Sequence, residues 1–160
     1  MDAYVSAVCG RLAAYGEKYG RRKVGTVYFG GGTPSVLGAK RLCDILRGVR
    51  TAFDVQPFAE ITAECNPADV DKAFFDTLKA GGFNRISMGM QSANADELQL
   101  LGRRHTAGDV KNAVEAARAA GIGNVSVDLM LALPGSDEEK LKKSVDFCAE
   151  LGADHYRLIF

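Results

Sequence analysis

The chain has 160 residues, enough for one domain over residues 1–160 that buries a sizeable core. Its 20 Lys and Arg balance its 20 Asp and Glu, which argues against nucleic acid or an anionic membrane surface as a partner. No apolar stretch reaches membrane-spanning length and no signal-peptide pattern opens the chain, so a cytoplasmic setting is expected.

Helical and strand-like segments alternate along the whole chain. Apolar residues at steps of three and four predict helices, and near-continuous apolar runs predict buried strands. The expected helices cover residues 3–19, 42–53, 70–78, 92–101, 106–120 and 136–151. The expected strands cover residues 24–29, 60–64, 85–90, 125–130 and 156–160. This order favours a parallel α/β sheet covered by helices, and spacing alone does not separate an open doubly wound sheet from part of a β/α barrel.

Capping residues mark where several of these helices should begin. Asp69 is placed to cap the third expected helix. Thr106 with Asp109, and Ser136 with Glu139, have the spacing of capping boxes. All three sites predict a helix start directly after a loop.

A glycine-rich loop, Gly30–Pro34, follows the first expected strand. Three glycines let the backbone bend sharply and let a ligand lie against its amides, while Pro34 biases Thr33 toward an extended conformation. The loop is neither a dinucleotide fingerprint, which would need glycine at Ser35, nor a P-loop. It indicates a small-molecule site, and a loop that only needs flexibility is the alternative.

Polar residues stand where the next strands end. Glu64, Gln91 and Asp128 lie at or near the carboxyl ends of expected strands, which open on one face in a β/α architecture. Asp128 interrupts an apolar run, so it needs a ligand or a partner, and hydrogen bonds from loop amides are the alternative. Arg103 and Arg104 are expected to be solvated, although either could pair with a ligand carboxylate.

The cysteines are scattered and form no C-x-x-C pair. Cys9, Cys43 and Cys148 fall on apolar helical positions and are interpreted as small buried hydrophobic residues, and Cys65 follows a strand. Disulfides are not expected, and the sequence shows no metal site.

Taken together, the motifs resemble a known family. They occur in this order: residues 27–35 (VYFGGGTPS), 64–67 (ECNP), 84–92 (NRISMGMQS), 101–105 (LGRRH) and 128–135 (DLMLALPG). The series resembles the radical S-adenosylmethionine proteins of the oxygen-independent coproporphyrinogen III oxidase family, and its haem-chaperone branch more than the oxidase. The resemblance covers nearly the whole chain.

This resemblance implies a partial (β/α) barrel, truncated at both ends, that binds S-adenosylmethionine. The glycine loop would cradle the methionyl amino group, the arginine would pair with the methionyl carboxylate, and the other three side chains would contact the ribose, amino group or sulfonium. The positions that match are Gly31, Gly32, Thr33, Glu64, Gln91, Arg103 and Asp128.

Two departures from the family pattern limit what this chain can do. The Cys-x-x-x-Cys-x-x-Cys motif that ligates the family's [4Fe–4S] cluster is absent, and Leu131 and Ala132 replace the usual Tyr-Gly. The intact relative would hold the cluster, S-adenosylmethionine and haem, and would deliver haem to an accepting protein. One alternative function is the oxidative decarboxylation of coproporphyrinogen III, and another is that the chain is an inert remnant of such a protein. An ordinary β/α barrel that binds phosphate is disfavoured by the glycine loop. The chain alone is expected to be inactive.

Truncation would leave both outer strands without a neighbour. Residues 24–29 and 156–160 would then present free backbone groups on apolar edges, which are templates for association. We expect edge-to-edge dimers or aggregates of the isolated chain.

Anaerobic reconstitution with iron and sulfide should leave the protein without a stoichiometric cluster, because no cysteine triad is available. Iron and sulfide would be determined after desalting. About four irons per chain, the content of a [4Fe–4S] centre, would contradict this prediction.

Overall fold

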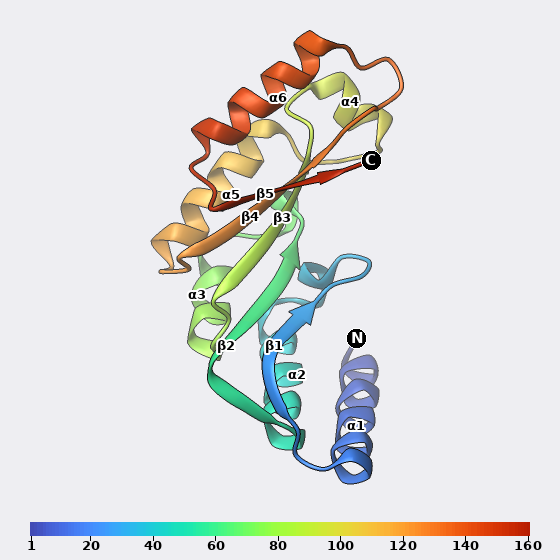
Figure 1. The fold of residues 1–160 in the computed structure, drawn as a ribbon, viewed down its shortest axis with the longest axis vertical. Helices are drawn as coiled ribbons and strands as arrows, with labels where there is room; N and C mark the ends of the chain where they lie inside the picture. Colours follow the sequence, from blue (N-terminus) through green and yellow to red (C-terminus); the bar gives the residue numbers. More distant parts are fainter.

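The fold is one five-stranded sheet in which each strand pairs with the next along the chain, in the order β1-β2-β3-β4-β5. The computed structural model describes residues 1–160, and every neighbouring pair of strands is parallel. Figure 1 shows the strands twisting strongly from β1 to β5, with α2, α3, α5 and α6 along one side of the sheet. The sheet is a curled half-barrel, as predicted.

All expected helices and strands are present. The strands are β1 (Lys23–Phe29), β2 (Asp54–Cys65), β3 (Arg85–Gln91), β4 (Asn124–Met130) and β5 (His155–Ile159). The helices are α1 (Asp2–Tyr19), α2 (Ala39–Ala52), α3 (Lys72–Gly81), α4 (Ala95–Leu100), α5 (Ala107–Ala119) and α6 (Glu138–Glu150), with short 3₁₀ turns at Pro34–Leu37 and Pro67–Asp69. None of the helices combines the length and apolar character that a membrane span requires.

The strand β2 is longer than the sequence indicated, because its first half is irregular. It begins at Asp54, which pairs with Lys23, and the register with β1 then shifts between Val24 and Thr26. Phe58 in this half is 98% exposed. A strand segment that faces solvent and contains a register shift lacks the apolar run that identifies buried strands.

The cap of α3 is Asp71, and the prediction of Asp69 was wrong. The Asp71 carboxylate accepts a hydrogen bond from the amide of Phe74 at 2.7 Å. Asp69 belongs to the preceding 3₁₀ turn, where its amide donates to the carbonyl of Asn66, and its carboxylate pairs with Arg104 at 3.2 Å. The helix therefore starts after that turn.

The start of α6 differs in the same way, whereas the start of α5 is as predicted. Asp137, not Ser136, caps α6 and accepts from the amide of Lys140 at 2.8 Å. The amide of Ser136 closes the preceding turn, so the helix starts one residue later. Thr106 and Asp109 form both hydrogen bonds of a capping box at α5.

Strand residues alternate between a core face and an open face. In β4, Val125, Val127 and Leu129 are buried in the apolar cluster between the sheet and the helices, while Ser126 and Asp128 point to the other face. The same period leaves the concave face of the sheet with polar side chains. This face is where a ligand can reach the strands.

The helix α1 packs on α2 and buries none of its own residues. Glycines allow the approach: a Cβ on Gly16 would lie 2.8 Å from the carbonyl oxygen of Ala52, and one on Gly48 would lie 3.1 Å from Cys9 Sγ. The strands β1 and β5 are the two edges of the sheet, as predicted. Their association stays a prediction.

Ala132, at one of the two departures from the family pattern, has a φ of +57°. Replacing exposed Ala132 by Gly should raise the free energy of unfolding by about 0.5–1 kcal/mol, because relief of about 1–2 kcal/mol of left-handed strain exceeds the added freedom of Gly in the unfolded chain. Chemical denaturation measures the change. Ala7→Gly, in the middle of α1, is the control and should destabilise by about 0.5–1 kcal/mol. If both variants change the free energy of unfolding in the same direction, Ala132 is not strained.

Candidate functional site

The carboxyl ends of the strands surround a polar cavity of about 160 Å³ on the concave face. Six of the seven expected site residues line it, and the seventh, Gly31, donates its amide to Glu64 Oε2 at 3.1 Å. The lining residues are Gly32, Thr33, Pro34, Glu64, Cys65, Asn66, Ser87, Gly89, Gln91, Arg103, Asp128 and Arg157. The structure thus brings together residues that are far apart in the sequence.

The glycine loop needs its glycines. Gly31 and Gly32 have φ values of +84° and +63°, in the region that favours glycine. A Cβ on Gly30 would lie 2.5 Å from a ring carbon of Tyr28. Thr33 has a φ of −137° and a ψ of 89°, outside the helical region that Pro34 disfavours but short of the fully extended conformation expected. The loop is therefore defined by backbone geometry and close packing, and not only by flexibility.

The end of β3 is distorted so that Gln91 faces the cavity. The register with β4 shifts between Gly89 and Gln91, and Gln91 has a φ of +69°. The amide of Ser92 donates to the carbonyl of Met90 at 2.9 Å, which closes a tight γ-turn around Gln91, and His105 Nε2 donates to the same carbonyl at 3.0 Å. Gln91 is 6% exposed and its Oε1 has no hydrogen-bond partner. The bend therefore places Gln91 against the cavity with a side-chain oxygen that no group of the chain pairs.

Asp128 is paired with an arginine that the sequence analysis did not single out. Arg157 Nε lies 2.9 Å from Asp128 Oδ1 and Arg157 Nη2 lies 2.6 Å from Oδ2, a two-pronged ion pair between neighbouring strands. Ser87 also donates to Asp128 Oδ1 at 3.4 Å. The sequence left open that loop amides donate to the Asp128 carboxylate. In the structure the donors are Arg157 and Ser87 instead.

The same arginine reaches across the sheet to its other strands. Arg157 Nη2 lies 3.6 Å from Glu64 Oε1, and Nη1 donates to the Tyr28 hydroxyl at 3.4 Å. Tyr28 in turn donates to Glu64 Oε1 at 2.6 Å. Burial, and then the Glu64 carboxylate, raise the pKa of the Tyr28 hydroxyl, and the hydrogen bond to Asp128 raises the pKa of Arg157. Both groups therefore stay protonated near neutral pH.

The two consecutive arginines after α4 have different surroundings. Arg104 pairs with Asp69, whereas Arg103 lines the cavity and its guanidinium has no hydrogen bond or ion pair. Arg103 is thus available to an anionic group. With Arg157, it balances the charges of Glu64 and Asp128.

Sequence reasoning missed three residues of this face: Tyr28, Ser87 and Arg157. A signal existed for the first two, because the two-residue period of a strand places Tyr28 and Ser87 on the same face as Glu64 and Asp128. Arg157 is adjacent to Asp128 only through the register of β4 with β5, which the sequence does not show.

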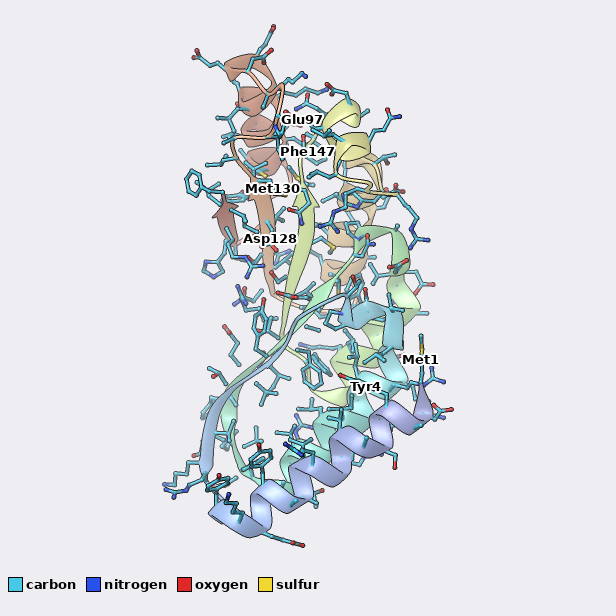
Figure 2. The ribbon with its side chains drawn as sticks, turned by 90° about the vertical axis from the view of Figure 1, so that its right-hand side faces the viewer. Met1, Tyr4, Glu97, Asp128, Met130 and Phe147 are labelled. Carbon is cyan, nitrogen blue, oxygen red and sulfur yellow. The ribbon has the colours of Figure 1, made fainter.

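A buried polar network supports the loop that follows Gln91. The Ser92 hydroxyl donates to Glu97, and Asn94 Nδ2 donates to Glu97 Oε2 at 3.1 Å and to the carbonyl of Lys140 at 2.9 Å. Ser144 of α6 accepts from the amide of Ala93. Figure 2 shows Glu97 between α4 and α6, above Asp128 on the sheet. Together these contacts fasten the end of β3 to the helices.

The cysteines do not fit a cluster site. They lie on α1, α2, the end of β2 and α6, and no three His, Cys, Asp or Glu side chains gather where they could hold a metal ion. Cys148 and Cys65 are buried, whereas Cys9 and Cys43 are only partly buried, so the expectation of burial was wrong for these two. Burial raises the pKa of Cys148 to about 11 and also raises that of Cys65. Buried thiols of this kind are poor ligands.

The chain is similar in sequence to a known superfamily and to several of its members. The profile of the Radical SAM superfamily matches residues 8–148. Heme chaperone HemW of Mycobacterium tuberculosis is 39% identical over 96% of this chain and 40% of its own length, and HemW of Bacillus subtilis is 35% identical over 98% and 41%. The mitochondrial radical S-adenosyl methionine domain-containing protein 1 of Danio rerio is 37% identical over 85% and 31%.

The fold is also similar to solved structures. The coproporphyrinogen III oxidase HemN of Escherichia coli, a radical SAM enzyme, superposes with a TM-score of 0.88 at 28% identity, over 98% of this chain and 37% of its own. The chain spans about 40% of the length of the HemW proteins of M. tuberculosis and B. subtilis.

Glu97, which is 4% exposed, should make stability depend on pH. Burial alone would raise the pKa of its carboxyl, but hydrogen bonds from neighbouring Ser and Asn side chains outweigh this and lower it. Glu97→Gln should therefore cost about 1.5–3 kcal/mol of unfolding free energy near pH 7. Because the pKa is lowered on folding, the contribution is present above the unfolded pKa and is lost as the pH falls through the folded one.

The measurement is urea denaturation of wild type and Glu97→Gln from neutral pH downward. The difference between them should shrink below about pH 4.5, the ordinary range of a Glu carboxyl. Glu115→Gln, at an exposed position on α5, is the matched control and should change little at any pH. A pH-independent difference for Glu97→Gln would refute the charged hydrogen-bond network.

Proposed function

The chain belongs to the radical SAM superfamily, and from this premise we propose that its concave cavity binds the S-adenosylmethionine of a haem-chaperone protein of the HemW type. The observation that supports this most is the convergence of the glycine loop, Glu64, Gln91, Arg103 and Asp128 around one cavity. The glycine loop, Glu64, Gln91 and Asp128 lie at the ends of β1 to β4, and Arg103 lies in the loop between α4 and α5. Polar residues rarely converge in this way without a ligand.

The chemistry of each group suits one part of the proposed ligand. The backbone carbonyl groups of the loop around Gly31 and Gly32 and the carboxylate of Glu64 are acceptors, which suits an amino group. The unpaired guanidinium of Arg103 suits a carboxylate, which it can bind in two-pronged fashion. The buried Oε1 of Gln91 would accept a hydrogen bond from the ligand.

The cavity also has a size that favours the methionyl end. Its volume of about 160 Å³ is smaller than the roughly 300–1,000 Å³ of pockets for whole drug-sized ligands. We therefore place the methionyl head in the cavity and the nucleoside on the open concave face, near Asp128.

The [4Fe–4S] cluster and haem are proposed only because longer relatives of this chain are expected to bind them. A [4Fe–4S] cluster supplies the electron that cleaves the sulfonium bond in this superfamily, and the cysteines of this chain do not fit it. Haem is carried over from the HemW relatives, which are named heme chaperones, and delivery by a chaperone would need a protein that accepts the haem. On this reading the chain is part of one radical SAM core domain in the cytoplasm, and it binds the ligand without reacting.

The oxidative decarboxylation of coproporphyrinogen III is the second candidate. Its support is the close superposition with HemN. The Glu-x-Asn-Pro and Gly-Met-Gln-Ser motifs at residues 64–67 and 89–92 favour the haem-chaperone branch instead. An inert remnant is the third candidate, and it predicts no ligand binding.

Calorimetric titration with S-adenosylmethionine and S-adenosylhomocysteine tests the site. Wild type should bind both weakly, and Asp128→Ala and Gly31→Val should each weaken binding about tenfold or more, a loss of about 1.4 kcal/mol. Gly121→Val is the matched control, because Gly121 has a φ of +81°, close to the +84° of Gly31, but lies before β4 at the opposite end of the sheet. Equal heats for all variants would show that the ligand does not bind in this cavity.

A further inference from the structure

Arg157 occupies the position where a cationic ligand group would meet the two carboxylates of the site. Its guanidinium lies 2.6 Å from Asp128 and 3.6 Å from Glu64, and it also contacts the Tyr28 hydroxyl. One side chain from the edge strand β5 therefore neutralises carboxylates on β4 and β2. Both acids therefore already have a counter-charge within the chain itself.

The two members of the main ion pair differ in how easily they can move. The side chain of Asp128 is 7% exposed, whereas that of Arg157 is 47% exposed. Asp128 also lies on β4, which pairs with a strand on each side, and accepts a hydrogen bond from Ser87. Arg157 can swing into solvent with little loss of packing, because long basic side chains keep their charged end in water. Any exchange of partners at this site must therefore move Arg157.

The charges around the cavity balance only while Arg157 is in place. Glu64 and Asp128 face Arg103 and Arg157, a sum of zero, and removal of Arg157 leaves one negative charge. A positive charge brought between the two carboxylates must displace the guanidinium or be repelled by it. A ligand with no charge at that point neither has to displace the guanidinium nor is repelled by it.

We propose that Arg157 sets the charge preference of this site, acting as an internal competitor that weakens binding of cationic ligands relative to neutral ones. The inference rests on the proposed function, since it concerns the same cavity. Arg157 is a specificity-determining residue here and takes no part in a reaction.

A pair of ligands isolates this effect. S-adenosylmethionine and S-adenosylhomocysteine differ by one methyl group and by the positive charge of the sulfonium. The ratio of their dissociation constants, measured by calorimetry near neutral pH, therefore reports how the site treats that charge. The variants are Arg157→Gln, which removes the charge, and Arg157→Lys, which keeps it but loses the planar two-pronged contact.

Arg157→Gln should change the ratio of the two dissociation constants about tenfold in favour of S-adenosylmethionine binding. This is within the range that close charge pairs contribute to binding. Arg157→Lys should shift the ratio in the same direction by a smaller factor. Arg47→Gln removes an equal charge from an exposed pair with Asp44 on α2, and it should leave the ratio unchanged. Circular dichroism checks folding, and if Arg157→Gln does not fold, Arg157→Lys carries the test.

The outcomes separate this inference from the proposed function. Binding of both ligands with the same ratio in wild type and the Arg157 variants overturns the role of Arg157 and leaves the proposed function intact. Binding of S-adenosylmethionine only after Arg157→Gln supports both. If neither ligand binds wild type and neither binds any folded Arg157 variant, the proposed function is overturned, and the inference with it.

Discussion

Side chains alternate between two faces along each parallel strand, and this period of two determines where the molecule has its core and where it has its chemistry. Helices cover one face, so residues such as Val127 and Leu129 pack there, and the residue between them, Asp128, must point to the open concave side. Since the strands are parallel, their carboxyl ends share one edge. Polar residues placed once per strand therefore meet in a single cavity, although long stretches of sequence separate them.

The end of β3 breaks this regular alternation, and the break is useful. A register shift and a positive φ turn Gln91 out of the sheet pattern, at a cost on the order of 1–3 kcal/mol. The carbonyl of Met90 accepts two hydrogen bonds, and the network around Glu97 holds the following loop. The surrounding contacts thus stabilise a strained residue whose buried acceptor stays without a partner. This acceptor is the group that the proposed ligand would pair.

Short-range patterns were enough to predict the parallel strands and the glycine loop, whereas the curled half-barrel and the full set of residues at the cavity, Arg103 among them, came from the resemblance to a known family. Alternation of apolar runs and helical stripes identifies the elements, and the loop Gly30–Pro34 has the geometry that its composition demands. The caps of α3 and α6 were misplaced because turns in front of these helices use the amides of Asp69 and Ser136. Arg157 could not be predicted, because its contact with Asp128 depends on strand register and on the curl that brings β5 toward β1.

A carboxylate buried as deeply as Asp128 needs a counter-charge whether or not a ligand is bound, since an uncompensated buried charge is strongly destabilising. The chain meets that need with a side chain from an edge strand that is about half exposed. This contact within the chain therefore opposes a cationic ligand at the same oxygen atoms. Affinity for such a ligand is a difference between two ion pairs, one inside the chain and one across the site. Two proteins with the same glycine loop and the same strand-end acids can bind one ligand with different strengths if they differ at position 157.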